Sequence, residues 1–158
     1  MSRDTDIKIV GALGEKIVKT SLEALGLQVM MSENQYDRVK DMMVEGETVE
    51  VKTLTLIKKF KAFCMESNQW KKLDNVDRLF FVEIPDYGNP IIVYEAIEKY
   101  HFTESFNGGI KRFYPKDRMR KFCVIHDNDV ERTLRNYTDS NFIIRGENDR
   151  APFSTSFE

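Results

Sequence analysis

Apolar side chains recur at three- and four-residue steps near the beginning of the chain. They are Ile7, Val10, Ile17, Leu22 and Leu25, and Gly26 follows them. This spacing puts the five side chains on one face of a helix, and a glycine at that point is a common end signal. The sequence therefore predicts a helix over residues 7–25.

Beyond residue 26 the apolar positions alternate or run together in short groups, which is typical of strands. The predicted strands cover residues 27–31, 38–44, 47–55, 62–66, 78–84 and 91–96. Between them, the sequence predicts a hairpin turn at Glu45-Gly46, a short helix over 67–75, a turn between extended pieces at 106–110 and a last helix over 128–137. This order of elements predicts an α/β fold.

The length and composition fit one globular domain. The chain has 158 residues, of which 41% are hydrophobic and 32% charged, and this is ordinary for a soluble protein. No apolar run approaches the roughly 18 residues of a spanning helix, and "MSRDTDIKIV" lacks the basic start and apolar middle of a secretory signal. We expect a cytoplasmic protein with no membrane partner, one domain over residues 1–145, and a mobile tail over 146–158 that has little to bury.

The cysteines and histidines do not suggest a metal cluster. Cys64 and Cys123 lie in apolar contexts, which favours reduced core residues over a disulfide or a zinc site. His126 opens "HDND", which lacks the ligand spacing of a calcium loop, so we interpret it as a cap of the helix that follows. His101 is interpreted as structural.

The net charge of −2 hides two basic stretches. Residues 58–72 hold five lysines against one acid, and residues 111–121 hold six basic residues against one acid. Such stretches either bind backbone phosphates or form a solvated face, and the sequence leaves both open. The candidate nucleic-acid-binding residues are Lys58, Lys59, Lys61, Lys71, Lys72, Lys111, Arg112, Lys116 and Arg118. Phe60, Phe63 and Trp70 could stack on bases beside them, although aromatics at such positions are more often core.

The predicted hairpin carries the candidate chemistry. A two-residue turn at Glu45-Gly46 places Asp41 directly opposite Glu50. Side chains alternate along a strand, so Lys52 shares the face of Glu50. Two opposed carboxylates repel unless a cation lies between them, and Mg²⁺ prefers such oxygen ligands. Lys52 would then lie beside a metal-bound water or a phosphate.

Asp37 is the alternative ligand, because it shares a strand face with Asp41. In this register Asp37 lies opposite Leu54, roughly 13 Å from the position of Glu50 at about 3.3 Å per residue. One cation with ligand bonds of about 2.1 Å cannot span that gap. Asp41 is therefore the predicted ligand, and Asp37 is assigned to the turn entering the strand or to the rim of the site.

An acid on one strand followed by Glu-Val-Lys, residues 50–52, on the next resembles the PD-(D/E)XK nuclease superfamily. "GALGE" (11–15) looks like the Gly-x-x-Gly-Glu that opens the first helix of many members, and "NQWKKL" (68–73) is similar to the helix after the lysine strand. The resemblance covers about residues 7–84, with Lys40 where a proline often precedes the acid. It implies a restriction-endonuclease-like core, α-β-β-β-α-β, with a mixed sheet flanked by helices and extra C-terminal strands and a helix.

The resemblance also implies an activity and roles for the site residues. The expected enzyme is a nuclease dependent on Mg²⁺ or Mn²⁺ that hydrolyses phosphodiester bonds, with DNA as the expected substrate. Asp41, Glu50 and Glu15 would hold the metal, Lys52 would position water or stabilise charge, and Gln69 would support the site. A junction-resolving or RNA-directed nuclease, a non-cleaving nucleic-acid-binding module and a homodimer all stay open.

Overall fold

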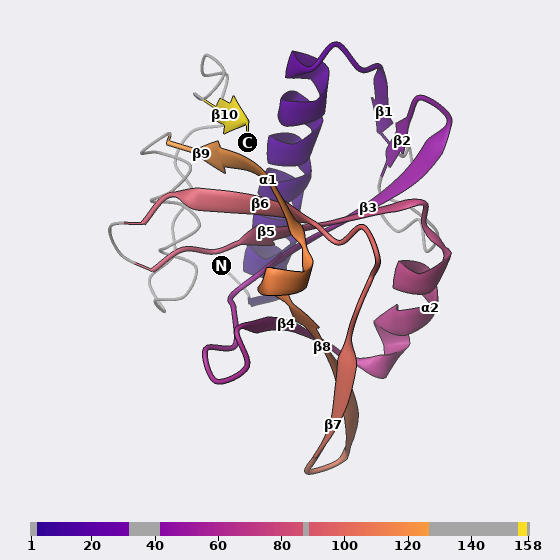
Figure 1. Ribbon diagram of the computed structural model, residues 1–158, viewed down its shortest axis with the longest axis vertical. Helices are drawn as coiled ribbons and strands as arrows, with labels where there is room; N and C mark the ends of the chain where they lie inside the picture. The colour runs from indigo at the N-terminus through magenta and orange to yellow at the C-terminus, as the bar shows by residue number, and fades with distance from the viewer. Residues whose placement is uncertain (1–2, 32–41, 87–88, 127–154, 158) are drawn as a thin grey trace.

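The protein is described by a computed structural model over residues 3–31, 42–86, 89–126 and 155–157. Within these ranges it is a mixed α/β protein whose elements follow one another as shown in Figure 1. They are α1 (Arg3–Ala24), β1 (Val29–Met31), β2 (Met42–Val44), β3 (Glu47–Leu54), β4 (Ala62–Met65), α2 (Ser67–Asn75), β5 (Arg78–Glu83), β6 (Ile91–Glu95), β7 (Phe102–Phe106), β8 (Gly109–Pro115), the 3₁₀ turn η1 (Lys116–Arg118), β9 (Arg120–Ile125) and β10 (Thr155–Phe157). Neither α-helix in the described part is long and apolar enough to cross a membrane.

The strands form two sheets. The larger has seven strands in the order β1-β2-β3-β5-β6-β9-β10, and the smaller has the order β4-β8-β7. In the larger sheet β3 and β5 are parallel, and the other neighbours are antiparallel. Parallel strands need a crossover connection, and here it contains β4 and α2. The expected order α-β-β-β-α-β is therefore present, with β4 as an addition before the second helix.

Helix α1 confirms the first predicted element and begins earlier than expected. Val10, Ile17 and Leu22 are buried as the periodicity predicted. Leu25 is 50% exposed, which corrects the prediction. The helix ends at Ala24 and Gly26 adopts a φ of +86°, so Leu25 lies in the turn and no longer follows the helical face.

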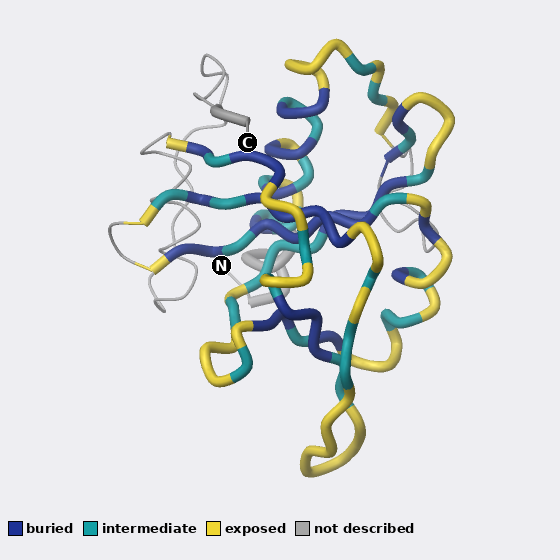
Figure 2. The backbone as a smooth tube through the Cα atoms, viewed as in Figure 1, coloured by how far each residue is buried: buried dark blue, intermediate teal, exposed yellow. Residues whose placement is uncertain are grey.

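The two faces of the larger sheet bury different cores. Val49 and Val51 of β3 pack with α1 in one cluster, whereas Leu54 packs with Leu73 of α2 in the other. Because side chains alternate along β3, Glu50 and Lys52 lie on the α2 face. Figure 2 shows the buried centre of the sheet and the exposed end of the β7–β8 hairpin.

The predicted β2–β3 hairpin is confirmed in its turn and register. Met42 pairs with Val49 and Val44 with Glu47. Glu45 and Gly46 both have positive φ, 49° and 84°, as a tight two-residue hairpin turn requires. Residues 38–41, which begin the predicted first strand and include Asp41, lie outside the described residues, as does Asp37.

Most other predicted elements are present with small changes at their ends. Residues 67–75 form α2 as expected, and the turn within 106–110 joins β7 to β8. Thr155–Phe157 form β10 beside β9, where the sequence predicted no strand. The predicted helix over 128–137, and with it the capping role of His126, lies outside the described residues.

Both cysteines are free, as predicted. Cys123 is fully buried and its thiol contacts the Ser21 hydroxyl, while burial raises the pKa of that thiol to about 11. Cys64 is half-buried. Phe63 is buried and stacks on Phe81, which supports its core interpretation.

Candidate active site

The candidate site centres on two side chains of β3. Glu50 is 1% exposed although it carries a carboxylate. Lys52 lies two residues further along the same face, and its Nζ is 2.9 Å from Glu50 Oε2. A buried carboxylate is costly unless it is paired, so the local structure is organised around this ion pair.

Helix α2 supplies two further members of the cluster. Gln69 Oε1 accepts a hydrogen bond of 2.6 Å from Lys52 Nζ. Lys72 Nζ lies 3.1 Å from Glu50 Oε1, so a second ammonium group contacts the same carboxylate. Gln69 and Lys72 are three residues apart and therefore share one side of the helix, while Leu73 is buried in the core that holds α2 against the sheet.

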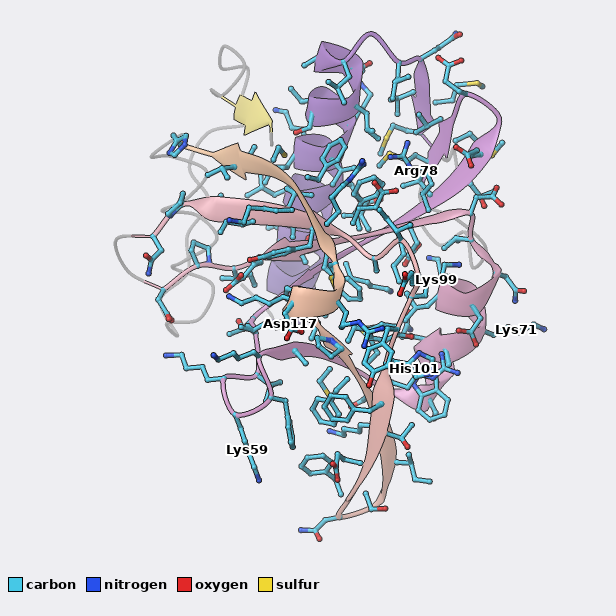
Figure 3. All side chains as sticks on the ribbon, viewed as in Figure 1. Lys59, Lys71, Arg78, Lys99, His101 and Asp117 are labelled. Carbon is cyan, nitrogen blue, oxygen red and sulfur yellow. The ribbon has the colours of Figure 1, made fainter. Side chains whose placement is uncertain are left out.

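The sequence did not predict that Lys72 contacts Glu50. It was grouped with the surface lysines as a candidate phosphate contact, yet its side chain is 17% exposed and touches Glu50. Lys71, the preceding residue, is exposed and extends away from the protein in Figure 3. The three-residue spacing between Gln69 and Lys72 was a signal that could have found it.

Glu15 lies on α1, next to Gly14, where this helix approaches β3 closely. A Cβ atom at Gly14 would lie 1.7 Å from the Thr53 hydroxyl oxygen, so Gly14 lets the two elements touch. Glu15 itself is half-buried. Helix α1 covers the Val49 and Val51 face of β3, opposite the face of Glu50, so the joint metal site predicted for Glu15 and Glu50 stays a prediction.

The oxygen atoms of Glu50 and Gln69 are of the type that binds a divalent cation. Glu50 offers a carboxylate and Gln69 an amide oxygen, and both are hard donors of the class that Mg²⁺ prefers. In the described ranges, no three acidic, histidine or cysteine side chains gather closely enough to hold a metal. A complete site needs a further ligand, which the sequence assigns to Asp41.

Several of the other candidate phosphate-binding residues pair with nearby acids. The ion pairs are Lys58–Asp86 at 3.3 Å, Lys111–Glu66 at 3.9 Å, Lys116–Glu83 at 3.9 Å and Arg118–Glu98 at 3.6 Å. Lys59 lies over the ring of Phe60 and, like Lys61, is exposed. The pairs of Lys58, Lys111 and Arg118 are exposed and therefore weak, and the partly buried Lys116–Glu83 pair is long. A phosphate can compete for these cations.

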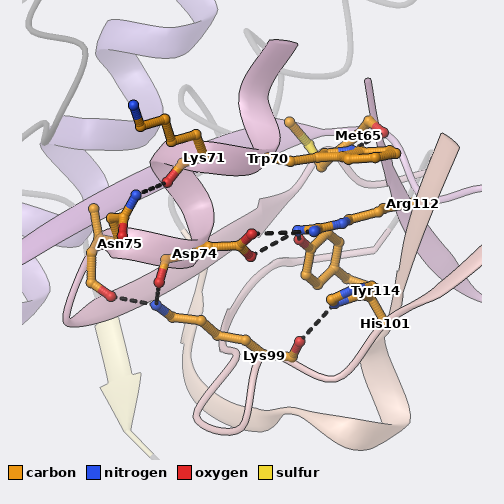
Figure 4. Close-up of polar contacts among 10 residues, drawn as sticks. Met65, Trp70, Lys71, Asp74, Asn75, Lys99, His101, Arg112 and Tyr114 are labelled. Atoms are coloured by element: carbon orange, nitrogen blue, oxygen red, sulfur yellow. Dashed lines mark hydrogen bonds and ion pairs between the residues drawn. The ribbon is translucent and has the colours of Figure 1, made fainter. Parts of the chain in front are cut away.

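Arg112 is held much more firmly than the other surface cations. Its guanidinium donates to both oxygens of Asp74, at 2.7 and 3.1 Å, and lies 4.5 Å from the ring centre of Trp70 (Figure 4). The same hydrogen bonds hold the pKa of the Asp74 carboxyl below its ordinary value. These contacts tie β8 to α2, so the described role of Arg112 is structural.

His101 also has a structural environment, as the sequence indicated. Its Nδ1 lies 3.0 Å from the Lys99 carbonyl oxygen, and its ring packs 5.2 Å from that of Tyr114. The Lys99 ammonium donates to the backbone carbonyls of Asp74 and Val76 at the end of α2 (Figure 4).

A groove of about 570 Å³ opens at the carboxyl ends of β3 and β5. Lys58, Lys61 and Lys116 line it together with Glu83 and Asp86. Its lining begins at Thr55, three residues after Lys52 and thus roughly 10 Å further along at about 3.3 Å per residue. The groove brings lysines from both basic stretches to one place near the site.

A second buried carboxylate lies on the opposite face of the larger sheet. Glu95 is 6% exposed, and Arg78 donates to its two oxygens at 2.9 and 3.1 Å. Arg120 donates to it at 2.6 Å. The two guanidinium groups lie over Phe80 and Phe122, which belong to the core beneath α1. No sequence motif indicated this cluster.

Comparisons with known proteins add little to the site. No family model matches the chain, and no curated protein matches it. Among solved structures, it is similar to D212, a nuclease from a fusselovirus, with a TM-score of 0.37 and 12% identity over 80% of this chain and 89% of that one. So weak a likeness assigns neither a fold family nor an activity to this protein.

Proposed function

We propose that the protein is a metal-dependent nuclease that hydrolyses phosphodiester bonds, with DNA as the preferred substrate. The observation that supports it most is the buried cluster of Glu50, Lys52 and Gln69. An acid and a lysine two residues apart on β3 are in direct contact, and an amide from the helix after that strand fixes the lysine. Stability alone does not require burying such a group, since apolar residues of similar size often do as well.

Each member of the cluster has a distinct role in this proposal. Glu50 would hold a Mg²⁺ or Mn²⁺ ion together with Asp41, and Glu15 would add a further acid. The ion would supply an activated water and neutralise charge on the phosphate. Lys52 would stabilise the negative charge that develops on the phosphate, and Gln69 would keep the Lys52 ammonium aimed at that position.

The groove at the ends of β3 and β5 extends the proposal to the substrate. Lys58, Lys61 and Lys116 line it within reach of a backbone that passes the site. The ion pair of Lys58 with Asp86 is exposed, and that of Lys116 with Glu83 is 3.9 Å long, so phosphates would replace these acids with release of counterions. This supports a polyanionic substrate, and the comparison of DNA with RNA substrates tests the proposed preference for DNA.

The test is incubation with linear duplex, single-stranded, branched and RNA substrates, each with magnesium and with EDTA. We expect cleavage with magnesium, none with EDTA, and none from Glu50→Gln. Glu47→Gln is the matched control, because it makes the same change at an exposed position of the same strand, outside the cluster, and it should cleave at the wild-type rate.

The pattern of products separates the alternatives. Preference for branched substrates would identify a junction-resolving enzyme, and preference for RNA an RNA-directed one. Binding to any of these substrates without cleavage would identify a binding module and refute the proposed activity. Full cleavage in EDTA would refute the metal dependence.

A further inference from the structure

Each oxygen of the Glu50 carboxylate lies within ion-pair distance of a different lysine. Lys52 Nζ lies 2.9 Å from Oε2, and Lys72 Nζ lies 3.1 Å from Oε1. The side chains of the two lysines are 18% and 17% exposed, so both contacts are largely shielded from water. The carboxylate that the proposed activity needs as a metal ligand is thus engaged by two ammonium groups.

An ammonium at this distance competes with a divalent cation for the same oxygen. A magnesium ion binds a carboxylate oxygen at about 2.1 Å and requires near-octahedral geometry around it. Lys72 Nζ at 3.1 Å from Oε1 would fall within a few ångströms of that ion. Two positive charges so close in a buried site repel strongly, so binding of the metal favours displacement of one ammonium.

The two lysines lie on different elements. Lys52 shares the strand with Glu50 and donates to Gln69 at 2.6 Å, which fixes its ammonium from a second element. Lys72 lies in the last turn of α2, where the carbonyl ends of the helix favour a positive charge. A lysine side chain is a flexible stem with a compact charge, so the Lys72 ammonium can leave Oε1 and remain in a favourable place.

We propose that Lys72 is the counter-ion of Glu50 in the metal-free protein, and that the divalent cation displaces it from Oε1. Lys72 is in this view a positioning residue that sets the affinity of the site for metal. It keeps the buried carboxylate neutralised before the ion arrives. This inference rests on the proposed function, because it needs Glu50 to be a metal ligand.

The direct test is calorimetric titration of the full chain, without nucleic acid, with manganese chloride. Lys72→Met removes the competing charge but keeps an unbranched side chain. We expect it to bind manganese about tenfold more tightly, within the usual range of coupling between neighbouring sites. Lys72→Arg keeps the charge and should bind no more tightly than wild type. Lys71→Met, beside it on the exposed side of α2, should leave the affinity unchanged.

Thermal unfolding gives a second measurement that a purely structural lysine would not reproduce. Without metal, Lys72→Met should unfold at a lower temperature than wild type, because Glu50 has lost one of its counter-ions. Saturating manganese should raise its melting temperature by more than it raises that of wild type. In the Glu50→Gln background, Lys72→Met should no longer change the response to manganese.

The outcomes distinguish this inference from the proposed function. If wild type cleaves with magnesium but Lys72→Met binds manganese no more tightly, the inference is wrong and the proposed nuclease stands. If neither wild type nor Lys72→Met binds manganese and neither cleaves, both are wrong. Tighter binding by Lys71→Met to the same extent would show a general effect of surface charge and would also overturn the inference.

Discussion

Glu50 and Glu95 are two buried carboxylates on opposite faces of one sheet, and each lies between two cations. Glu50 is paired with Lys52 and Lys72. Glu95 is paired with Arg78 and Arg120. The two clusters carry the same formal charges, and both carboxylates are buried. Arg120 is 51% exposed, whereas the other three cations are 17–18% exposed. The clusters differ most clearly in the kind of cation.

Arginine and lysine side chains hold a buried carboxylate in different ways. Arg78 donates two hydrogen bonds from a rigid fork to the two oxygens of Glu95 and stacks over Phe80, and these hydrogen bonds raise the pKa of its guanidinium. Such a contact fixes both position and orientation. A lysine offers a single charged nitrogen on a flexible stem, which another cation can replace. The arginine cluster therefore suits a permanent structural contact, and the lysine cluster suits a site that exchanges its cation.

The largest expected effect is on stability at the arginine cluster. Glu95→Gln keeps the shape of the side chain but leaves Arg78 largely buried without its counter-ion. We expect the free energy of unfolding to fall by about 3–5 kcal/mol, as measured by urea denaturation. The fraction of protein that remains folded should keep its cleavage rate.

Glu98→Gln is the control for this prediction. Glu98 is close in sequence, its side chain is 72% exposed, and it pairs with Arg118 at 3.6 Å. Its substitution should change the free energy of unfolding by less than about 1 kcal/mol. A stable Glu95→Gln protein that no longer cleaves would contradict the structural assignment of the arginine cluster.

At the lysine cluster, we expect a substitution to reduce cleavage much more than stability. Lys52→Ala should lower the cleavage rate by about 10²–10³-fold, the loss that follows removal of one charge-stabilising donor at a transition state. Glu50 keeps Lys72 in this variant, so the melting temperature should fall only slightly. Single-turnover cleavage with saturating magnesium measures the effect.

Arg120→Ala is the matched control, because it also removes one of two cations from a buried carboxylate. It should lower stability and leave single-turnover cleavage within a few-fold of wild type. Equal losses of cleavage in Lys52→Ala and Arg120→Ala would remove the distinction between the two clusters.

The sequence predicted the elements around Glu50 because their signals are local. The hairpin register follows from the alternation of apolar residues and from Glu45-Gly46, and the contact between Glu50 and Lys52 follows from the two-residue period of a strand. The smaller sheet was not predicted as a sheet, because Ala62 of β4 pairs with Pro115 of β8 far along the chain. Nothing local specifies which of many extended segments meet.

The candidate site was predicted only where its members share an element or a turn. Glu50 and Lys52 were found together, and Gln69 came from the resemblance to a family. Lys72 was assigned to the surface because a run of lysines does not show which one faces the sheet. Glu95 and its two arginines come from three strands, so only the folded sheet brings them together.

A third substitution, of Gly14 on α1, tests whether the packing on one face of β3 affects the residues on its other face. Gly14→Ala places a methyl group 1.7 Å from the Thr53 hydroxyl oxygen if nothing moves, so α1 or β3 has to shift. We expect a loss of about 1–3 kcal/mol, as overpacking usually costs, together with a lower cleavage rate because Glu50 lies on the same strand. Urea denaturation and the cleavage assay measure the two effects.

Gly11→Ala is the control on the same helix. Apart from the adjacent backbone of the helix itself, no atom of the described residues lies within 4 Å of an added Cβ there. Alanine should therefore stabilise α1 by up to about 1 kcal/mol through its helix propensity. Adding Thr53→Ala to Gly14→Ala removes the clashing hydroxyl and should recover part of the lost stability. Wild-type cleavage in a destabilised Gly14→Ala protein would show that the face of Glu50 is independent of α1.

The smallest effect extends the comparison from buried carboxylates to an exposed one. Asp74 has an arginine fork like that of Glu95, but its side chain is 47% exposed. The hydrogen bonds from Arg112 lower the pKa of Asp74 from its ordinary 3.8, so the pair stabilises the folded state above about pH 3.8. This contribution disappears as the pH falls through the folded pKa.

Because water screens the pair, Asp74→Asn should lower the free energy of unfolding by no more than about 1 kcal/mol at pH 7. It should also reduce the steepness of acid unfolding. Urea denaturation at pH 7 and at pH 3 measures both. A loss at pH 7 as large as that of Glu95→Gln would show that the fork geometry, and not burial, determines the strength of these clusters.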